Sequence, residues 1–274
     1  CFLRVGVENR SSYRYDSFFA ALAPYLNFRN DAESVKERLR EVFEQSGFGP
    51  RIFAFLNYGN LVLEFYNPGD PNPGEAELVS WVSTELGVDY NGTNKDAAQR
   101  LWKSYNRFLA FLESDKAKFD IDFSTKDKTK EYRQFAQMLA LPGIITARGL
   151  IFIVLELNEK NELTVRCPPF GYNVDQYSSS DFAFILHRSS GIWEPIFYSA
   201  NRAQTARFPA RHQPEITFQR SLEAGWPSIV KQRVVEFTQQ CRGLGRGAYT
   251  STRMIDPMAL LPISVAVQSM PHIK

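Results

Sequence analysis

Ser17 is the first residue whose setting could support chemistry. It lies in the segment "YRYDSFFAAL" (13–22), where Asp16 precedes the hydroxyl and an apolar stretch typical of a buried helix follows it. A hydroxyl at the start of a helix benefits from the helix dipole and from free amides that can hold an oxyanion. Ser17 could therefore be an activated nucleophile. Serine at this position more often caps the first turn of a helix, and that interpretation stays open beside the first.

A serine nucleophile needs a base within hydrogen-bond reach, and the three histidines of the chain are the candidates. His187 ends a predicted strand, His212 lies in a polar, proline-flanked loop, and His272 is close to the end of the chain. A surface position is the more common role for each of them. No two histidines have the spacing of a metal site, so we expect no bound metal. An active hydrolase would pair Ser17 with His187 or His212.

The carboxylates offer a weaker candidate, a metal-dependent nuclease centre. It would combine Asp120 and Asp122 with Glu156 and Lys160. Such a centre needs acids that converge on magnesium, with a lysine close behind an acid on the same strand face. Here four residues separate Lys160 from Glu156 and the chain passes into a turn. The segment "DIDFSTKDK" (120–128) is better interpreted as a solvated loop.

Charge and cysteine usage narrow the functional classes. The chain has 32 basic and 30 acidic residues, and this balance argues against a protein that coats nucleic acid or an anionic membrane. Cys1, Cys167 and Cys241 are odd in number and widely spaced, so we expect no disulfide, no zinc site and a reducing compartment. The longest apolar run, "GLIFIVLEL" (149–157), is too short to span a bilayer. Nothing in the sequence indicates a cofactor.

The first half of the chain is predicted to be mainly helical. Alternating apolar residues predict a short strand over 2–7, and helical spacing predicts helices over 17–26, 31–49, 75–86 and 94–114. Residues 51–68 carry apolar residues on both sides of "NYGN", which predicts a hairpin of two strands. A further short helix begins at Glu131 and is stopped by Pro142.

The second half is predicted to supply the central sheet. Strand patterns occur at 149–157, 163–167, 182–188 and 193–199, and a final amphipathic helix covers 228–241. Helices in front and strands behind indicate an α+β fold rather than an alternating parallel one. We predict one domain over residues 1–241. Residues 242–274 are predicted to form an extended tail or a linker to a following domain.

"DSFFAAL" resembles the nucleophile motif of OTU-type cysteine peptidases, which runs asparagine–cysteine–leucine–phenylalanine–arginine–alanine–leucine. Asp16 takes the asparagine position and Ser17 the cysteine position. The matches in type are Phe18, Phe19, Ala21 and Leu22, whereas Ala20 replaces the arginine. "ILHRSSGIWEPIFY" (185–198) resembles the late strand pair of that family, whose catalytic histidine would fall on Ile192 or Trp193.

This resemblance implies a papain-like, OTU-like fold with N-terminal helices packed on a mixed, mostly antiparallel sheet. It also implies a pseudoenzyme, because a hydroxyl replaces the thiol and no imidazole remains to assist it. The relic site would contain Asp16, Ser17, Trp193 and Glu194. Trp193 and Pro195 would then bind a peptide or a ubiquitin-like protein.

A second resemblance covers nearly all of residues 1–241. The blocks that carry it are "CFLRVGVENRSSYRYDSFFAALA", "FAFLNYGNLVLEFYNP", "LWKSYNRFLAFLESD", "GLIFIVLELNEKNELTVRCPP" and "WEPIFY". They are similar, in the same order, to blocks of large uncharacterised proteins of nucleocytoplasmic large DNA viruses. This implies a segment of a longer viral protein, a virion or assembly component in the virion or the infected-cell cytoplasm, whose partners are other viral proteins. We therefore expect a non-catalytic interaction or structural module, with a deubiquitinase-like hydrolase and a nuclease as the alternatives.

Overall fold

A computed structural model describes the chain in segments. These are residues 2–6, 17–26, 32–45, 47–90, 92, 94–113, 130–157, 163–167, 179–188, 191–200 and 215–241. The chain divides into two compact units. Unit 1 comprises Cys1–Val35 and Lys126–Tyr249, and unit 2 comprises Lys36–Thr125 and Thr250–Lys274. The single domain expected over 1–241 stays a prediction, and the expected tail after Arg242 lies outside the described residues.

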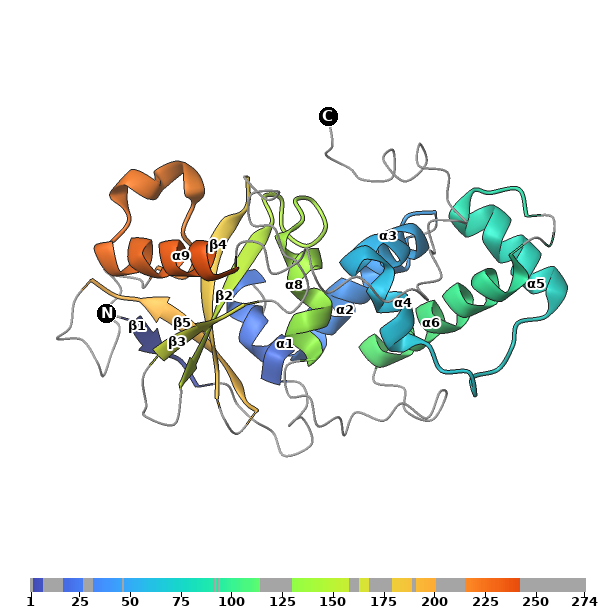
Figure 1. The fold of residues 1–274 in the computed structure, drawn as a ribbon, viewed down its shortest axis with the longest axis horizontal. Coiled ribbons are helices and arrows are strands. Elements are labelled where there is room, and N and C mark those ends of the chain that lie inside the picture. The colour runs from blue at the N-terminus through green and yellow to red at the C-terminus, as the bar shows by residue number, and fades with distance from the viewer. Residues whose placement is uncertain are drawn as a thin grey trace. The chain divides into compact units, whose positions relative to one another are not determined.

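Unit 1 is built on a five-stranded mixed sheet in the order β1-β5-β4-β2-β3 (Figure 1). Its strands are β1 (Phe2–Arg4), β2 (Leu150–Leu157), β3 (Leu163–Arg166), β4 (Asp181–His187) and β5 (Trp193–Tyr198). The β2–β4 pair is parallel and the other three pairs are antiparallel. The predicted α+β class is thereby confirmed, as are the strands predicted over 2–7 and in the second half of the chain. Continuous apolar runs in β2 and β4 fit strands whose two faces are both covered.

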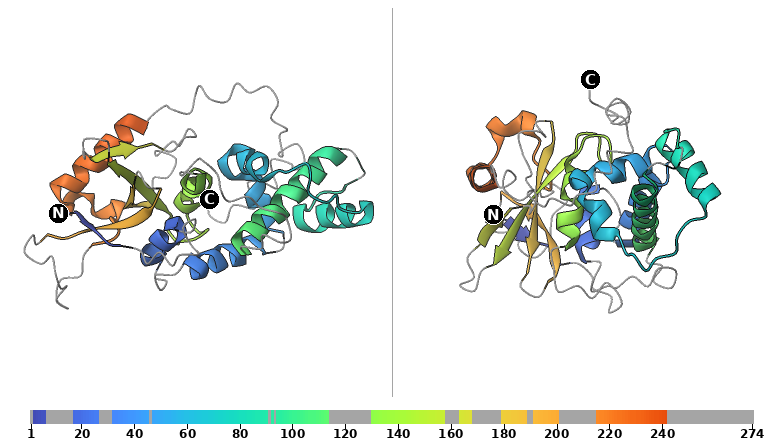
Figure 2. Two further views of the ribbon diagram at one scale, coloured as in Figure 1. Left: turned by 90° about the horizontal axis from the view of Figure 1, so that it is seen from below. Right: turned by 45° about the vertical axis from the view of Figure 1, so that its right-hand side comes forward.

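Helices cover the two faces of this sheet (Figures 1 and 2). One face carries α1 (Ser17–Leu22), the 3₁₀ turn η1 (Ala23–Leu26) and α8 (Lys130–Ala140). The other face packs against Phe218 and Trp226, which precede α9 (Ser228–Cys241). Of the helices expected to pack on the sheet from the first half, only α1 with η1 and the start of α2 belong to this unit.

Tyr25 ties the first helical segment to the sheet. Its hydroxyl donates to the backbone oxygen of Phe184 on β4 and accepts from the amide of Ile196 on β5, at 2.9 Å. Its ring packs edge-on against that of Phe152, with centroids 5.1 Å apart. Burial raises the pKa of Tyr25 above its ordinary value, because an ionised phenolate would lose its hydration. The N-terminal segment is therefore held to the sheet by polar as well as apolar contacts.

Unit 2 is helical. Its elements are α2 (Ala32–Phe43), which crosses the boundary between the units, α3 (Gly49–Phe55), the 3₁₀ turn η2 (Leu56–Gly59), α4 (Asn60–Phe65), α5 (Glu75–Trp81), the π-helical turn η3 (Val82–Leu86) and α6 (Lys95–Glu113). Its core is aromatic: the ring of Phe108 on α6 lies 4.7, 5.0 and 5.2 Å from those of Phe43, Phe53 and Phe65.

The hairpin predicted over 51–68 is wrong, because this segment forms α3, η2 and α4. Short apolar runs do not distinguish a buried strand from a buried helix. Here Phe53 and Phe65 lie on short helices, and both rings contact Phe108 on α6, so the apolar residues of the segment join a helical core. Gly59, expected at a hairpin turn, instead adopts φ +82° between η2 and α4. A left-handed residue of this kind suits glycine and breaks the helix there.

The expectation of no disulfide is also wrong, because Cys167 and Cys241 are joined. Cys167 follows β3 at the edge of the sheet, and Cys241 is the last residue of α9. Their separation of 74 positions hides the pairing from any argument based on spacing. Because these two cysteines are paired, the cysteine pattern no longer favours a reducing compartment. Within the described residues, no helix is both long and apolar enough to cross a membrane.

Candidate functional site

Ser17 is the first residue of α1 and is almost completely buried, with 2% of its surface exposed. Its Oγ accepts a hydrogen bond from the backbone amide of Trp193 at 3.2 Å. The structure therefore brings together two residues separated by 176 positions that the sequence placed in one relic site. Asp16, the third member of that site, lies outside the described residues.

Trp193 begins β5, and its backbone amide contacts the Ser17 hydroxyl. Its side chain is 1% exposed. The indole packs edge-on against Phe18, with centroids 5.2 Å apart, and lies 4.4 Å from the ring of His187. An indole N–H is a donor only and cannot accept a proton at neutral pH. The group next to the hydroxyl therefore cannot serve as a general base.

His187 is held by an acidic side chain that the sequence did not assign to it. It ends β4, where the register pairs it with Glu156 on the parallel strand β2 and with Trp193 on β5. Its Nδ1 lies 2.7 Å from Oε1 of Glu156, so Nδ1–H donates to the carboxylate. Glu156 also forms an ion pair with Arg166 on β3. A signal for this pair was present, because both residues stand at the ends of predicted strands.

Glu194 and Trp193 are consecutive residues of β5, so their side chains point to opposite faces of the sheet. Glu194 is 5% exposed, with its Oε2 2.9 Å from Nε of Arg4 and its Oε1 3.6 Å from Nη1 of Arg188. Pro195, predicted with Trp193 as a binding residue, is buried, and its carbonyl accepts from the amide of Val5 at 3.1 Å. The relic-site residues are thus divided between the two faces.

The other candidates are only partly visible. His212, His272, Asp120, Asp122 and Lys160 all lie outside the described residues, so the nuclease centre and the pairing of Ser17 with His212 stay predictions. Glu156, the remaining acid of the nuclease candidate, is engaged by His187 and Arg166. Within the described part of the chain, no three histidine, cysteine or acidic side chains gather where they could hold a metal ion.

The arrangement around Ser17 is that of an anchor. Among the described residues, the partner of the Ser17 hydroxyl is a backbone amide rather than an imidazole. The bond holds the start of α1 against the start of β5, with aromatic rings packed on either side. A hydroxyl in this position stabilises the packing of helix on sheet, and within the described part of the chain no base contacts it.

Comparison with known proteins adds no relative. No family model, no curated protein and no solved structure matches the chain. The function proposed next is therefore based on the geometry around Ser17 and on the resemblances of its sequence motifs.

Proposed function

We propose that the chain is a non-catalytic, OTU-like interaction or structural module of a large viral protein, a virion or assembly component. The observation that carries this proposal is the hydrogen bond from the amide of Trp193 to Oγ of Ser17. It joins the helix start that resembles the nucleophile position of OTU-type peptidases to the strand that resembles their histidine position. Serine and tryptophan now occupy these two positions.

The chemistry of Ser17 and Trp193 supports the absence of peptidase activity. Serine needs a base to remove its proton, and tryptophan cannot act as one. Ser17 and Trp193 are 2% and 1% exposed, so a peptide carbonyl has no access to the hydroxyl while the packing is intact. The site keeps the layout of helix start against strand start and uses it for stability.

The resemblance implies two locations, the virion and the infected-cell cytoplasm, and the disulfide favours the virion. Disulfides persist at virion surfaces and in other oxidising environments, whereas cytosolic thiols are kept reduced. The Cys167–Cys241 bridge joins β3 to the end of α9 within unit 1. We propose that the mature chain resides in the particle and that its partners are other viral proteins.

A fluorophosphonate probe tests the absence of catalysis. The probe reacts with activated serine nucleophiles, so we expect no labelling of the folded wild-type chain under conditions in which a known serine hydrolase is labelled completely. Mass spectrometry locates any adduct. A Ser17 adduct that is absent from the Ser17→Ala variant would overturn the proposal.

One observation favours a second candidate, an active hydrolase of Ser17, His187 and Glu156. The contact of 2.7 Å between Nδ1 of His187 and Oε1 of Glu156 is of the kind that orients an imidazole base. If this candidate is right, Ser17 labelling is present in the wild type and is lost in His187→Gln. A lack of labelling in both proteins removes it.

The partner proposal is tested with two preparations. We expect peptides of the chain in purified virus particles by mass spectrometry, and their absence would contradict the virion assignment. Ubiquitin is the ligand that the OTU resemblance implies, and binding of labelled ubiquitin to the folded chain can be titrated directly. A wild-type chain that does not bind ubiquitin at high micromolar concentration rejects it as the partner.

A further inference from the structure

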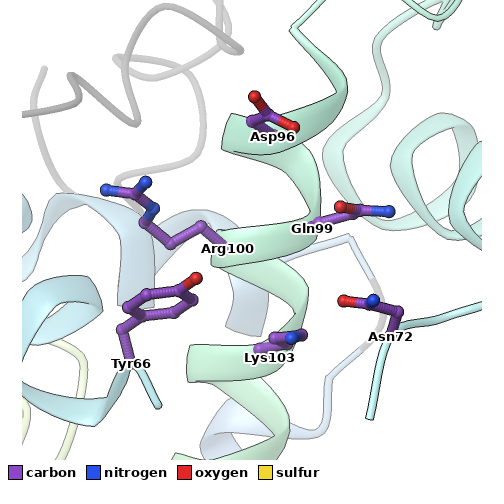
Figure 3. Close-up of a pocket in the computed structure, with 6 residues that line it drawn as sticks. All are labelled: Tyr66, Asn72, Asp96, Gln99, Arg100 and Lys103. Carbon is purple, nitrogen blue, oxygen red and sulfur yellow. The ribbon is translucent and has the colours of Figure 1, made fainter. Parts of the chain in front are cut away.

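A polar cavity lies along α6 in unit 2 (Figure 3). Its volume is about 120 Å³. Its lining residues are Tyr66, Asn72, Asp96, Gln99, Arg100 and Lys103. Four of them, at positions 96, 99, 100 and 103, belong to α6, where steps of three and four residues place them in a stripe on one side of the helix. Tyr66 and Asn72 come from the connection between α4 and α5.

Lys103 places a positive charge in this cavity, and burial of its ammonium group costs hydration free energy. It is only 5% exposed, and its Nζ donates to the backbone oxygen of Pro68 at 3.1 Å. An ammonium has three N–H donors, and a single carbonyl does not neutralise its charge. Among the described residues, no carboxylate lies within ion-pair distance of Lys103. A buried cation of this kind is stabilised by an anion that enters the cavity.

Arg100 adds a second cation that has no acidic partner among the described residues. Its guanidinium carbon lies 4.9 Å from the centre of the Tyr66 ring, and the close-up shows the two side chains one above the other (Figure 3). Its Nε is buried and has no hydrogen-bond acceptor among the described residues. Arg107, two turns further along α6, differs because its Nη1 lies 2.8 Å from Oδ1 of Asp70. The same helix thus carries one arginine paired with an acid and one that lacks such a partner.

The charge and size of the cavity define the ligand. Arg100 and Lys103 outnumber the single carboxylate of Asp96, which is exposed. The amides of Gln99 and Asn72 add neutral donors from another direction. Since a water molecule occupies about 30 Å³ in the liquid, the cavity has room for about four waters. It is much smaller than the pockets of about 300 Å³ or more that hold drug-sized molecules.

We propose that this cavity binds a phosphate group, either as the free ion or as a small phosphate monoester. A tetrahedral phosphate offers oxygens in several directions, which suits donors that come from different positions on α6 and from the preceding connection. A planar carboxylate offers only two oxygens and would leave part of these donors without an acceptor. The inference is independent of the function proposed for unit 1.

Calorimetric titration of the full, disulfide-bonded chain tests this proposal. Inorganic phosphate, O-phosphoserine and acetate are titrated separately at constant ionic strength. We expect saturable binding of phosphate at one site and weaker binding of acetate. Tighter binding of O-phosphoserine than of phosphate would assign the site to monoesters, and the reverse order to the free ion. Absence of phosphate binding, or acetate binding of equal strength, would overturn the proposal.

Four variants of α6 locate the site. Arg100→Gln and Lys103→Met should each weaken phosphate binding at least tenfold, because each removes a charged donor. Asp96→Asn should strengthen it several-fold by removing the like charge. Lys95→Gln is the matched control, since Lys95 lies on the same helix but does not line the cavity. Near-ultraviolet circular dichroism checks that each variant is folded.

Arg100 is half-buried, so we expect Arg100→Gln to fold even if Lys103→Met does not. Arg100→Gln then tests the assignment by itself. Phosphate affinity that is unchanged in Arg100→Gln, or that falls equally in Lys95→Gln, would show a non-specific effect of net charge and would refute the assignment.

Discussion

The two units bury polar side chains in opposite ways. In unit 1, the Ser17 hydroxyl accepts from the amide of Trp193, and His187 contacts Glu156. In unit 2, Lys103 and Arg100 line a cavity without an acidic partner among the described residues. Buried polar groups that are paired within the chain stabilise its packing, whereas buried charges without counter-charges indicate a ligand. The comparison therefore assigns a structural role to the first set and a binding role to the second.

This difference also shows that resemblance to a catalytic motif does not determine the present role of a segment. The segment around Ser17 has the sequence features of an active site, but its geometry is that of a core. The stripe on α6 resembles no catalytic motif, yet its cations are the side chains that a ligand would stabilise. The following changes test the comparison, and we order them from the largest expected effect to the smallest.

Trp193→Ala should have the largest effect on unit 1. It removes the indole that packs on Phe18 and His187 and leaves a cavity beside Ser17. We expect a loss of about 3–5 kcal/mol in the free energy of unfolding, measured by urea denaturation. Leu222→Ala, at a position that is 61% exposed, should change it by less than about 0.5 kcal/mol. A loss below about 1 kcal/mol for Trp193→Ala would show that the site is an open, loosely packed one.

Removal of the disulfide should come second. The double variant Cys167→Ser/Cys241→Ser frees the end of α9 from β3, and we expect a loss of about 2–4 kcal/mol because the bridge closes a long loop of the unfolded chain. Dithiothreitol should lower the urea midpoint of the wild type and leave that of the double variant unchanged. Equal midpoints for both proteins, with all three cysteines titrating as free thiols in the unreduced chain, would contradict the pairing.

Ser17→Ala should have a moderate effect. The variant leaves the buried amide of Trp193 without its acceptor, which should cost about 1–2 kcal/mol. Ser80→Ala, at an exposed position on α5, is the matched control and should be close to neutral. If Ser17→Ala is as neutral as its control, the hydroxyl does not anchor α1, and its role has to be sought in chemistry.

Lys103→Met should have the smallest effect on stability, in contrast to Ser17→Ala. Methionine has a similar length and no charge to dehydrate, so the free energy of unfolding in phosphate-free buffer should change by less than about 1 kcal/mol or increase. Thermal unfolding with and without phosphate measures both states. A loss of more than about 2 kcal/mol without phosphate would make Lys103 a structural residue and would remove the contrast between the units.

Local patterns predicted most of the elements. The strands of the sheet and the helices at α1, α2, α6 and α9 follow from apolar periodicity, since each is specified by residues close in sequence. Residues 51–68 were the exception, because their short apolar runs fit either period. In the structure they form α3 and α4, with Phe53 and Phe65 packed on Phe108.

The site could be predicted only in part. The pairing of Ser17 with Trp193 followed from a resemblance of motifs, and the structure places the two residues in contact. The Glu156–His187 pair was missed because it depends on β2 and β4 being neighbours in the sheet. The stripe from Asp96 to Lys103 stands at helical spacing in the sequence. Helical spacing does not show which polar side chains of a helix are buried, so the sequence did not predict the cavity.

The sequence determined the strands of the sheet, the helices outside residues 51–68, the α+β class and the serine that begins the first helix. Only the tertiary structure decided which distant side chains meet, as in the pairs Cys167–Cys241 and Glu156–His187. It also decided that Arg100 and Lys103 have no acidic partner among the described residues. The physical reason is that periodicity is a property of neighbouring residues, whereas contacts between distant residues depend on strand order and helix packing.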